Sequence, residues 1–246
     1  MKIFSVLALI IVAGVSVFAQ KLPIVVYLAG DSTLAEKKPE KRPETGWGEM
    51  FQQYFDEKKV RIENHAQNGR STKTFIGENR WQAIVDKLKK GDYVFIQFGH
   101  NDQSKDKGER YTPPEDFKKN LARMVADVRA KKANPILFTP VMRRRFDEDG
   151  KFYDAHGEYP DLTRSVAKSL KVPLIDMHRS SEKLIVGYGS EKSKKLFLQL
   201  KAGENPNYPN GIEDNTHFSP LGAEEMAKLA VTAIKESKIN LRKHLK

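Results

Sequence analysis

Short apolar runs recur along the chain, separated by longer segments whose apolar residues follow helical spacing. The runs are rich in β-branched and aromatic residues, and they cover residues 24–28, 60–65, 93–98, 135–138 and 172–175. Runs of this kind that alternate with helical segments are typical of buried strands in a parallel sheet. The pattern therefore predicts an α/β fold with a central parallel sheet of about five strands and helices on both faces.

The segments between these runs predict further elements. Residues 47–55 and 81–88 carry apolar side chains at helical spacing, which predicts a helix packed on the core in each segment. A last helix is predicted to begin at Ser219-Pro220, because a serine cap followed by proline favours a helix start. Residues 214–217, directly before it, are predicted to form a loop that enters this helix.

The first residues resemble a secretory signal peptide. Lys2 precedes a mostly apolar run from Ile3 to Val17, and Ala19 is the predicted cleavage point. The run is shorter than the roughly 20 residues that a bilayer-spanning helix needs, which argues against a membrane anchor. We expect a leader over residues 1–19, a single domain over residues 20–246, and a periplasmic or secreted product that is free of the membrane once the leader is removed.

Composition limits the classes of partner and chemistry. The chain carries a formal net charge of +11 and contains no cysteine, which excludes disulfides, thiol nucleophiles and thiolate metal ligands. The positive charge favours acidic partners. For an exported chain without a recognisable nucleic-acid-binding motif, an anionic polysaccharide fits better than nucleic acid. The charged stretches 36–44 and 143–160 are predicted to be exposed loops, and Arg143-Arg144-Arg145 is interpreted mainly as solvated charge.

Chemically distinctive residues follow the first three predicted strands. Ser32 lies in Gly-Asp-Ser-Thr after the first, Gly69 in Asn-Gly-Arg-Ser after the second, and Asn101 in Gly-His-Asn-Asp after the third. Taken singly, the glycine and the asparagine are also typical of turns. Because loops at the carboxyl ends of parallel strands converge, however, these residues are expected to share one site.

Asp214 and His217 complete a set suited to acyl transfer. A serine hydroxyl needs a base to accept its proton, and the base needs a partner that fixes its tautomer, so Ser32, His217 and Asp214 are the candidate catalytic residues. The oxyanion that develops needs preorganised donors. The candidates are the backbone N–H groups of Ser32 and Gly69 and the side-chain amide of Asn101.

In their order along the chain these segments resemble the signature blocks of the SGNH or GDSL-type hydrolases. The blocks are Gly30-Asp31-Ser32, Gly69, Gly99-His100-Asn101-Asp102 and Asp214-x-x-His217. Their extended forms resemble the rhamnogalacturonan acetylesterase branch: Gly30 to Thr33 with Gly46-Trp47-Gly48, Asn68 to Ser71, and Gln97 to Asp102. Thr33 stands where many members have leucine. The resemblance implies a three-layer α/β/α, flavodoxin-like fold and a serine mechanism without metal or other cofactor.

The function expected from the resemblance is that of a secreted carbohydrate O-acetylesterase that deacetylates pectic polysaccharide (rhamnogalacturonan) through an acetyl-enzyme. The expected partner is an acetylated, acidic polysaccharide, and the expected state is a monomer that binds no nucleic acid. Two alternatives stay open: an acetylxylan, lipid or other small-acyl esterase of the same family, and a noncatalytic polysaccharide-binding protein on the same fold.

Further residues are candidate substrate contacts. Arg70, beside Gly69, is placed to contact a galacturonate carboxylate, and Arg143-Arg144-Arg145 is the weaker candidate for the same contact. His100 in the third block is placed to contact substrate or tune the site, with packing and hydrogen bonding nearby as the alternative. The other histidines show no metal-ligand spacing with acidic neighbours, so no metal is predicted.

Overall fold

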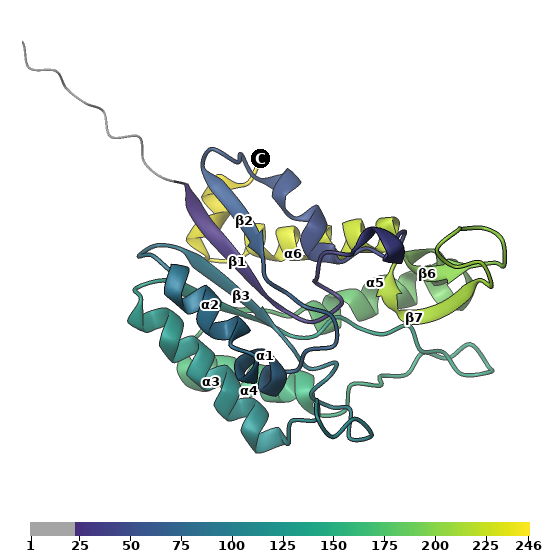
Figure 1. The fold of residues 1–246 in the computed structure, drawn as a ribbon, viewed down its shortest axis with the longest axis horizontal. Coiled ribbons are helices and arrows are strands. Elements are labelled where there is room, and N and C mark those ends of the chain that lie inside the picture. The colour runs from purple at the N-terminus through teal and green to yellow at the C-terminus, as the bar shows by residue number, and fades with distance from the viewer. Residues whose placement is uncertain (1–22) are drawn as a thin grey trace, which may run out of the picture.

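The fold is built on a parallel sheet with the strand order β2-β1-β3-β4-β5. A computed structural model describes residues 23–246, so the predicted leader lies outside the described residues (Figure 1). The strands are β1 (Ile24–Gly30), β2 (Val60–Asn64), β3 (Tyr93–Gln97), β4 (Asn134–Phe138) and β5 (Leu174–Ile175). All neighbouring pairs are parallel. The prediction of a five-stranded parallel sheet is confirmed.

Helices cover both faces of this sheet, as predicted (Figure 1). One face packs on α1 (Thr72–Gly77), α2 (Arg80–Lys87), α3 (Pro114–Ala130) and α4 (Tyr159–Leu170), and the other on α5 (Met177–Lys192) and α6 (Pro220–Glu236). Alternate side chains of β1 enter opposite cores, Val25 and Tyr27 on the first face and Val26 and Leu28 on the second. The result is the expected three-layer α/β/α architecture.

The segment 47–55 does not form the predicted α-helix. It forms two short 3₁₀ helices, Trp47–Met50 and Gln52–Tyr54. Its backbone is tied to the loop after β1, because Trp47 N donates to Thr33 O at 3.0 Å. The apolar side chains still face the core, and both Trp47 and Phe51 are fully buried.

A small antiparallel sheet lies beside the main one. Strands β6 (Phe197–Leu200) and β7 (Ile212–Phe218) form it, and β7 contains Asp214 and His217 (Figure 1). The expectation of a loop over residues 214–217 was therefore wrong. Ser219 then caps α6 by accepting a hydrogen bond from Gly222 N at 3.1 Å, which confirms the predicted helix start.

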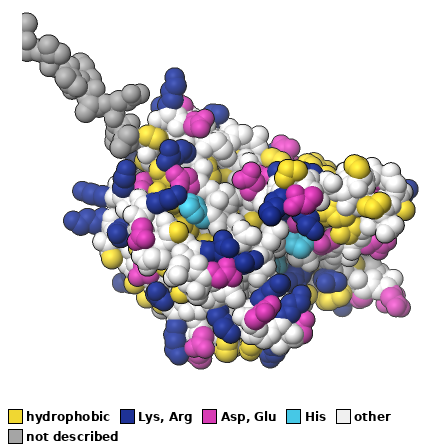
Figure 2. Space-filling model, in the orientation of Figure 1, with side chains coloured by type: hydrophobic (Ala, Val, Ile, Leu, Met, Phe, Trp, Pro, Cys, Tyr) yellow, Lys and Arg dark blue, Asp and Glu magenta, His cyan; other side chains and the backbone are white. Residues whose placement is uncertain are grey.

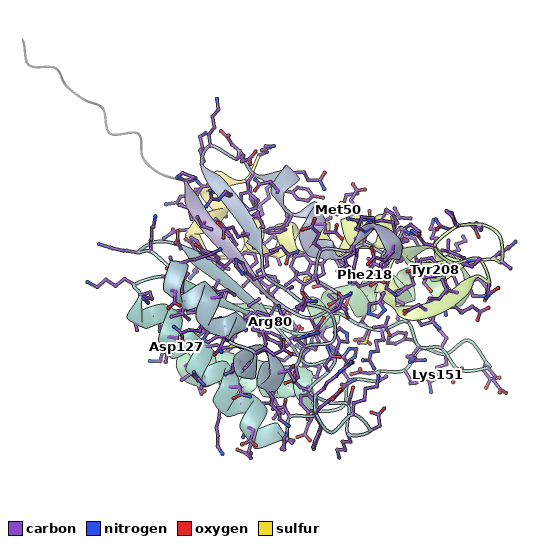
Figure 3. The ribbon with its side chains drawn as sticks, viewed as in Figure 1. Met50, Arg80, Asp127, Lys151, Tyr208 and Phe218 are labelled. Atoms are coloured by element: carbon purple, nitrogen blue, oxygen red, sulfur yellow. The ribbon has the colours of Figure 1, made fainter. Side chains whose placement is uncertain are left out.

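The segment that joins β6 to β7 contacts the charged stretch 36–44. Tyr208, labelled in Figure 3, donates its hydroxyl to Lys41 O at 2.9 Å, and Asn207 Nδ2 donates to Arg42 O at 2.8 Å. Two segments far apart in the sequence are thus joined at one side of the sheet.

Among residues 23–246, no helix is both long and apolar enough to cross a bilayer.

Candidate active site

Ser32, in the loop after β1, meets His217 of β7 at the carboxyl edge of the sheet. The His217 Nε2 atom lies 2.8 Å from Ser32 Oγ, and its Nδ1 atom lies 2.6 Å from Asp214 Oδ2. In this arrangement the Nδ1–H group donates to the carboxylate and Nε2 is free to accept the serine proton. The structure therefore brings the three predicted residues into one hydrogen-bonded chain.

Asp214 is surrounded by donors that favour its ionised form. Its Oδ1 atom accepts hydrogen bonds from the backbone N–H groups of Thr216 and His217, at 2.7 and 2.9 Å. Burial opposes ionisation, but the His217 side chain and these backbone donors outweigh it and hold the pKa of Asp214 below its usual range. The carboxylate is thus charged when a proton arrives on His217.

Arg144 fixes the strand that carries Asp214 and His217. Its guanidinium donates to Asn215 Oδ1 at 2.9 Å, to Ser193 Oγ at 3.1 Å and to Ser190 O, while its backbone N–H donates to Asn215 O. Only 9% of the residue is exposed. The interpretation of Arg144 as solvated charge was therefore wrong, because its donors are used within the protein.

The candidate oxyanion donors lie around Ser32. Gly69 has a φ of 76°, which glycine adopts without the strain that a side chain would bring. Asn101 Nδ2 donates one hydrogen to Arg70 O at 3.0 Å and keeps a second available. Within residues 23–246, the backbone N–H groups of Ser32 and Gly69 donate to no other protein group. All three residues line the same cavity as His217.

A buried ion pair beneath Ser32 was missed by the sequence analysis. Lys37 Nζ lies 2.9 Å from Glu44 Oε1, donates to Asn68 Oδ1 at 2.9 Å, and donates to the carbonyl of Ser32. These contacts use all three ammonium donors and join the loop of the serine to the loop of Gly69. The side chain of Lys37 is fully buried, so the prediction of an exposed loop was wrong for this residue and for Glu44.

His100 has both of its ring nitrogens engaged by the protein. Nε2 lies 2.9 Å from Val141 O, and Nδ1 lies 3.2 Å from Asp31 Oδ2. Burial opposes ionisation of Asp31, but His100 and the N–H and hydroxyl of Thr33 outweigh it and lower the pKa of Asp31. His100 therefore ties the nucleophile loop to the segment after β4, and it has no free nitrogen for the sugar contact that was expected.

Ser32 and His217 open into a polar cavity of about 590 Å³. Arg110, which the sequence analysis did not single out, and Arg143, which it weighed mainly as solvated charge, contribute to its walls together with Lys41 and Lys107. Figure 2 shows Lys and Arg side chains gathered beside a hollow in this face of the molecule. The cavity suits a polar, anionic ligand better than a fatty acyl chain.

Arg70 does not line this cavity. Its Nε donates to Glu78 Oε2 at 3.0 Å, and its Nη1 donates to Asn68 O at 2.8 Å, so its side chain faces a neighbouring hollow. The backbone carbonyl of Arg70 accepts a hydrogen bond from Asn101, but its guanidinium lies outside the cavity of Ser32, away from the contact with a galacturonate carboxylate that was predicted for it.

Asp154, His156 and His178 form a cluster in the fold. The sequence analysis missed it because His178 lies far from the other two residues along the chain. His156 Nδ1 lies 3.1 Å from Asp154 Oδ1, and His178 Nε2 lies 3.0 Å from Asp154 Oδ2, a grouping of the type that holds metal ions. Arg164 Nη2, however, lies 3.3 Å from His178 Nδ1. A guanidinium can only donate, whereas the second nitrogen of a metal-bound histidine normally donates itself. The donation from Arg164 therefore argues against a metal at His178, and the cluster joins the 143–158 segment to α5 through the close approach of His178 Nε2 to Asp154.

Comparison with known proteins identifies relatives over nearly the whole chain. The model of the GDSL-like lipase/acylhydrolase family matches residues 28–224. The chain is 47% identical to rhamnogalacturonan acetylesterase RhgT of Bacillus subtilis, over 92% of this chain and 95% of that protein. It is 39% identical to the probable rhamnogalacturonan acetylesterase YesY of the same organism, over 86% and 92% of the two chains.

A solved structure supports the same assignment. That of protein YxiM from B. subtilis superposes with a TM-score of 0.75 at 28% identity, covering 89% of this chain and 58% of that longer chain. With the geometry around Ser32, these matches show that the chain belongs to the GDSL-like lipase/acylhydrolase family and is an enzyme that hydrolyses carboxylic esters.

Proposed function

We propose that this chain is an exported carbohydrate O-acetylesterase that removes acetyl groups from an acidic pectic polysaccharide, with Ser32, His217 and Asp214 as its catalytic residues. The observation that carries the proposal is the contact between His217 Nε2 and Ser32 Oγ at 2.8 Å, inside a cavity with cationic walls. The substrate class is supported by the 47% identity to a rhamnogalacturonan acetylesterase, and export by the pattern of residues 1–19.

The proposed cycle follows from the positions of these atoms. Ser32 Oγ attacks the acetyl carbonyl carbon while its proton moves to His217 Nε2. The oxyanion accepts hydrogen bonds from the N–H groups of Ser32 and Gly69 and from Asn101 Nδ2. Collapse breaks the bond to the sugar oxygen, which takes the proton from His217. Water then repeats the sequence on the acetyl-enzyme, releasing acetate and restoring Ser32.

The test is acetate release from acetylated rhamnogalacturonan, acetylated xylan and a small neutral acetyl ester, comparing the wild type with Ser32→Ala. We expect release chiefly from the pectic polymer, and we expect Ser32→Ala to lose at least roughly 10³-fold in kcat because no covalent intermediate can form.

Each other outcome removes a stated part of the proposal. Serine-dependent release only from xylan or the small ester would exclude the pectic substrate. Wild-type turnover by a folded Ser32→Ala protein would exclude the serine mechanism. An absence of release from any substrate would favour another acyl group or a binding protein.

A further inference from the structure

The cavity at Ser32 carries more positive charge than its own acidic residues balance. Its charged side chains, apart from His100 and His217, are Lys41, Glu44, Asp106, Lys107, Arg110, Arg143 and Asp214. Glu44 is neutralised by Lys37, and Asp214 is bonded to His217. This leaves four cations facing the one remaining carboxylate, that of Asp106, and an excess of this kind favours an anionic ligand.

Arg110 presents an unused guanidinium beside the candidate oxyanion hole. A methyl group built on Gly69 would lie 3.3 Å from the Cζ and Nη1 atoms of Arg110, so the guanidinium covers this glycine closely. Within the described part of the chain, its side chain makes no hydrogen bond. The carboxylate paired with it belongs to Glu109, lies 3.8 Å away and is 79% exposed. The N–H donors along the edges of this guanidinium are therefore available to bind a ligand.

Arg143 is the second cation of this kind. Its Nη2 donates to His100 O at 3.2 Å, whereas its Nε is buried and has no hydrogen-bond partner among residues 23–246. The acidic groups that act on its charge are Asp31 and Asp214, and each of these already faces a histidine. A partly buried guanidinium without its own carboxylate is costly, and an anion bound in the cavity would offset that cost.

We propose that Arg110 and Arg143 form a subsite for the carboxylate of a uronic acid residue, at or next to the sugar that carries the acetyl group. The inference rests on the proposed function, because it assigns the ligand of that same cavity. A planar guanidinium matches the two oxygens of a carboxylate. The subsite would hold a uronate chain so that its acetyl ester lies against Ser32. Recognition of the carboxylate would then select esters that are carried by an acidic polymer.

The experiment compares two forms of one acetylated uronate polymer, the free acid and its methyl ester, with the wild type and Arg110→Gln. The methyl ester keeps the sugar and the acetyl groups but removes the negative charge. We expect the wild type to prefer the free acid, and Arg110→Gln to lower the ratio of the two kcat/KM values by roughly 10- to 100-fold, as expected for the loss of a hydrogen-bonded ion pair.

Arg123→Gln is the matched control, because it removes the same charge from a guanidinium on α3 that is paired with Asp127 and does not line this cavity. Its ratio is expected to stay at the wild-type value. Arg143→Gln is the second variant and should lower the ratio in the same direction.

The remaining outcomes overturn the subsite. If Arg110→Gln lowers kcat/KM equally on both polymer forms, Arg110 stabilises the Gly69 loop and does not bind the carboxylate of the substrate. If the wild type cleaves both forms equally, no carboxylate is recognised. If the wild type cleaves a small acetyl ester but neither polymer, the proposed function fails and the subsite fails with it.

Discussion

At the scale of single residues, the catalytic candidates were easier to predict from the sequence than the residues that hold them in place. Ser32, Gly69, Asn101 and His217 lie in short local patterns, so their types and neighbours predicted the site. Lys37 looked like one of many surface lysines. Its burial depends on Glu44 and Asn68, which only the fold brings to it. Local sequence patterns thus predict the candidate catalytic residues better than the buried residues that position them.

Lys37→Met tests this positioning role. The change leaves Glu44 buried without its cation and leaves the Ser32 carbonyl and Asn68 Oδ1 without a donor. We expect the free energy of unfolding to fall by about 3–5 kcal/mol. We also expect kcat on a small acetyl ester to fall while KM changes little, because the serine loop and the Gly69 loop lose their common anchor. Urea unfolding and steady-state kinetics measure the two effects.

A double variant separates positioning from stability. In Lys37→Met/Glu44→Gln the uncompensated charge is gone, so much of the stability should return while kcat stays low. Recovery of both quantities together would contradict a positioning role for Lys37.

At the scale of elements, strands were predictable where apolar residues mark at least one buried face. The main sheet is rich in β-branched and aromatic residues, and β1 and β3 are buried along nearly their whole length. Strand β7 is polar and half-exposed, so its sequence Ile-Glu-Asp-Asn-Thr-His-Phe resembled a loop. It is a strand because β6 pairs with it and Arg144, 71 positions away, binds Asn215, and neither partner is visible in the segment's own sequence.

Asp102 connects the segment after β3 to the start of α1. Its Oδ1 accepts hydrogen bonds from the backbone N–H and the hydroxyl of Thr72, at 2.9 and 2.6 Å, and its Oδ2 is buried without a hydrogen-bond partner within the described residues. Burial raises the pKa of Asp102 to about 6, despite the opposing effect of these donors. The folded protein therefore holds this proton more tightly than the unfolded chain does.

This shift predicts a pH-dependent stability that Asp102→Asn removes. The contribution is fully present below the unfolded pKa of about 4 and is lost as pH rises through about 6. Between pH 4.5 and 8, the free energy of unfolding of the wild type should fall, relative to the variant, by on the order of 2 kcal/mol. Urea unfolding across this range measures it, and parallel curves for the two proteins would contradict the assignment.

At the scale of the whole molecule, the charge of +11 coincides with a cation-lined cavity. Composition favoured a partner of negative charge but did not indicate where the positive charge would act, because Lys and Arg side chains are scattered over the face seen in Figure 2. The three layers place the loops after β1, β2 and β3 at one edge of the sheet. Four of the cationic side chains line the cavity there, so the positive potential is concentrated beside Ser32.

Ionic strength should therefore affect acidic and neutral substrates differently. Raising salt from about 50 mM to about 500 mM shortens the screening length severalfold. We expect kcat/KM on an acidic acetylated polymer to fall several-fold, and kcat/KM on a small neutral acetyl ester to change by less than about twofold. Initial rates over a salt series provide the measurement. An equal decline for both substrates would show that salt acts on the enzyme and not on substrate capture.

Ser32 and His217 are 185 positions apart in the chain, although their side chains touch. A chain synthesised only as far as β5 already contains every strand of the parallel sheet and every candidate oxyanion donor, yet it has no base for the serine. The capacity to cleave an ester would arise only when the last strand has docked. In a refolding experiment, acetate release would therefore report the docking of β7, whereas circular dichroism would report the formation of helices and sheet.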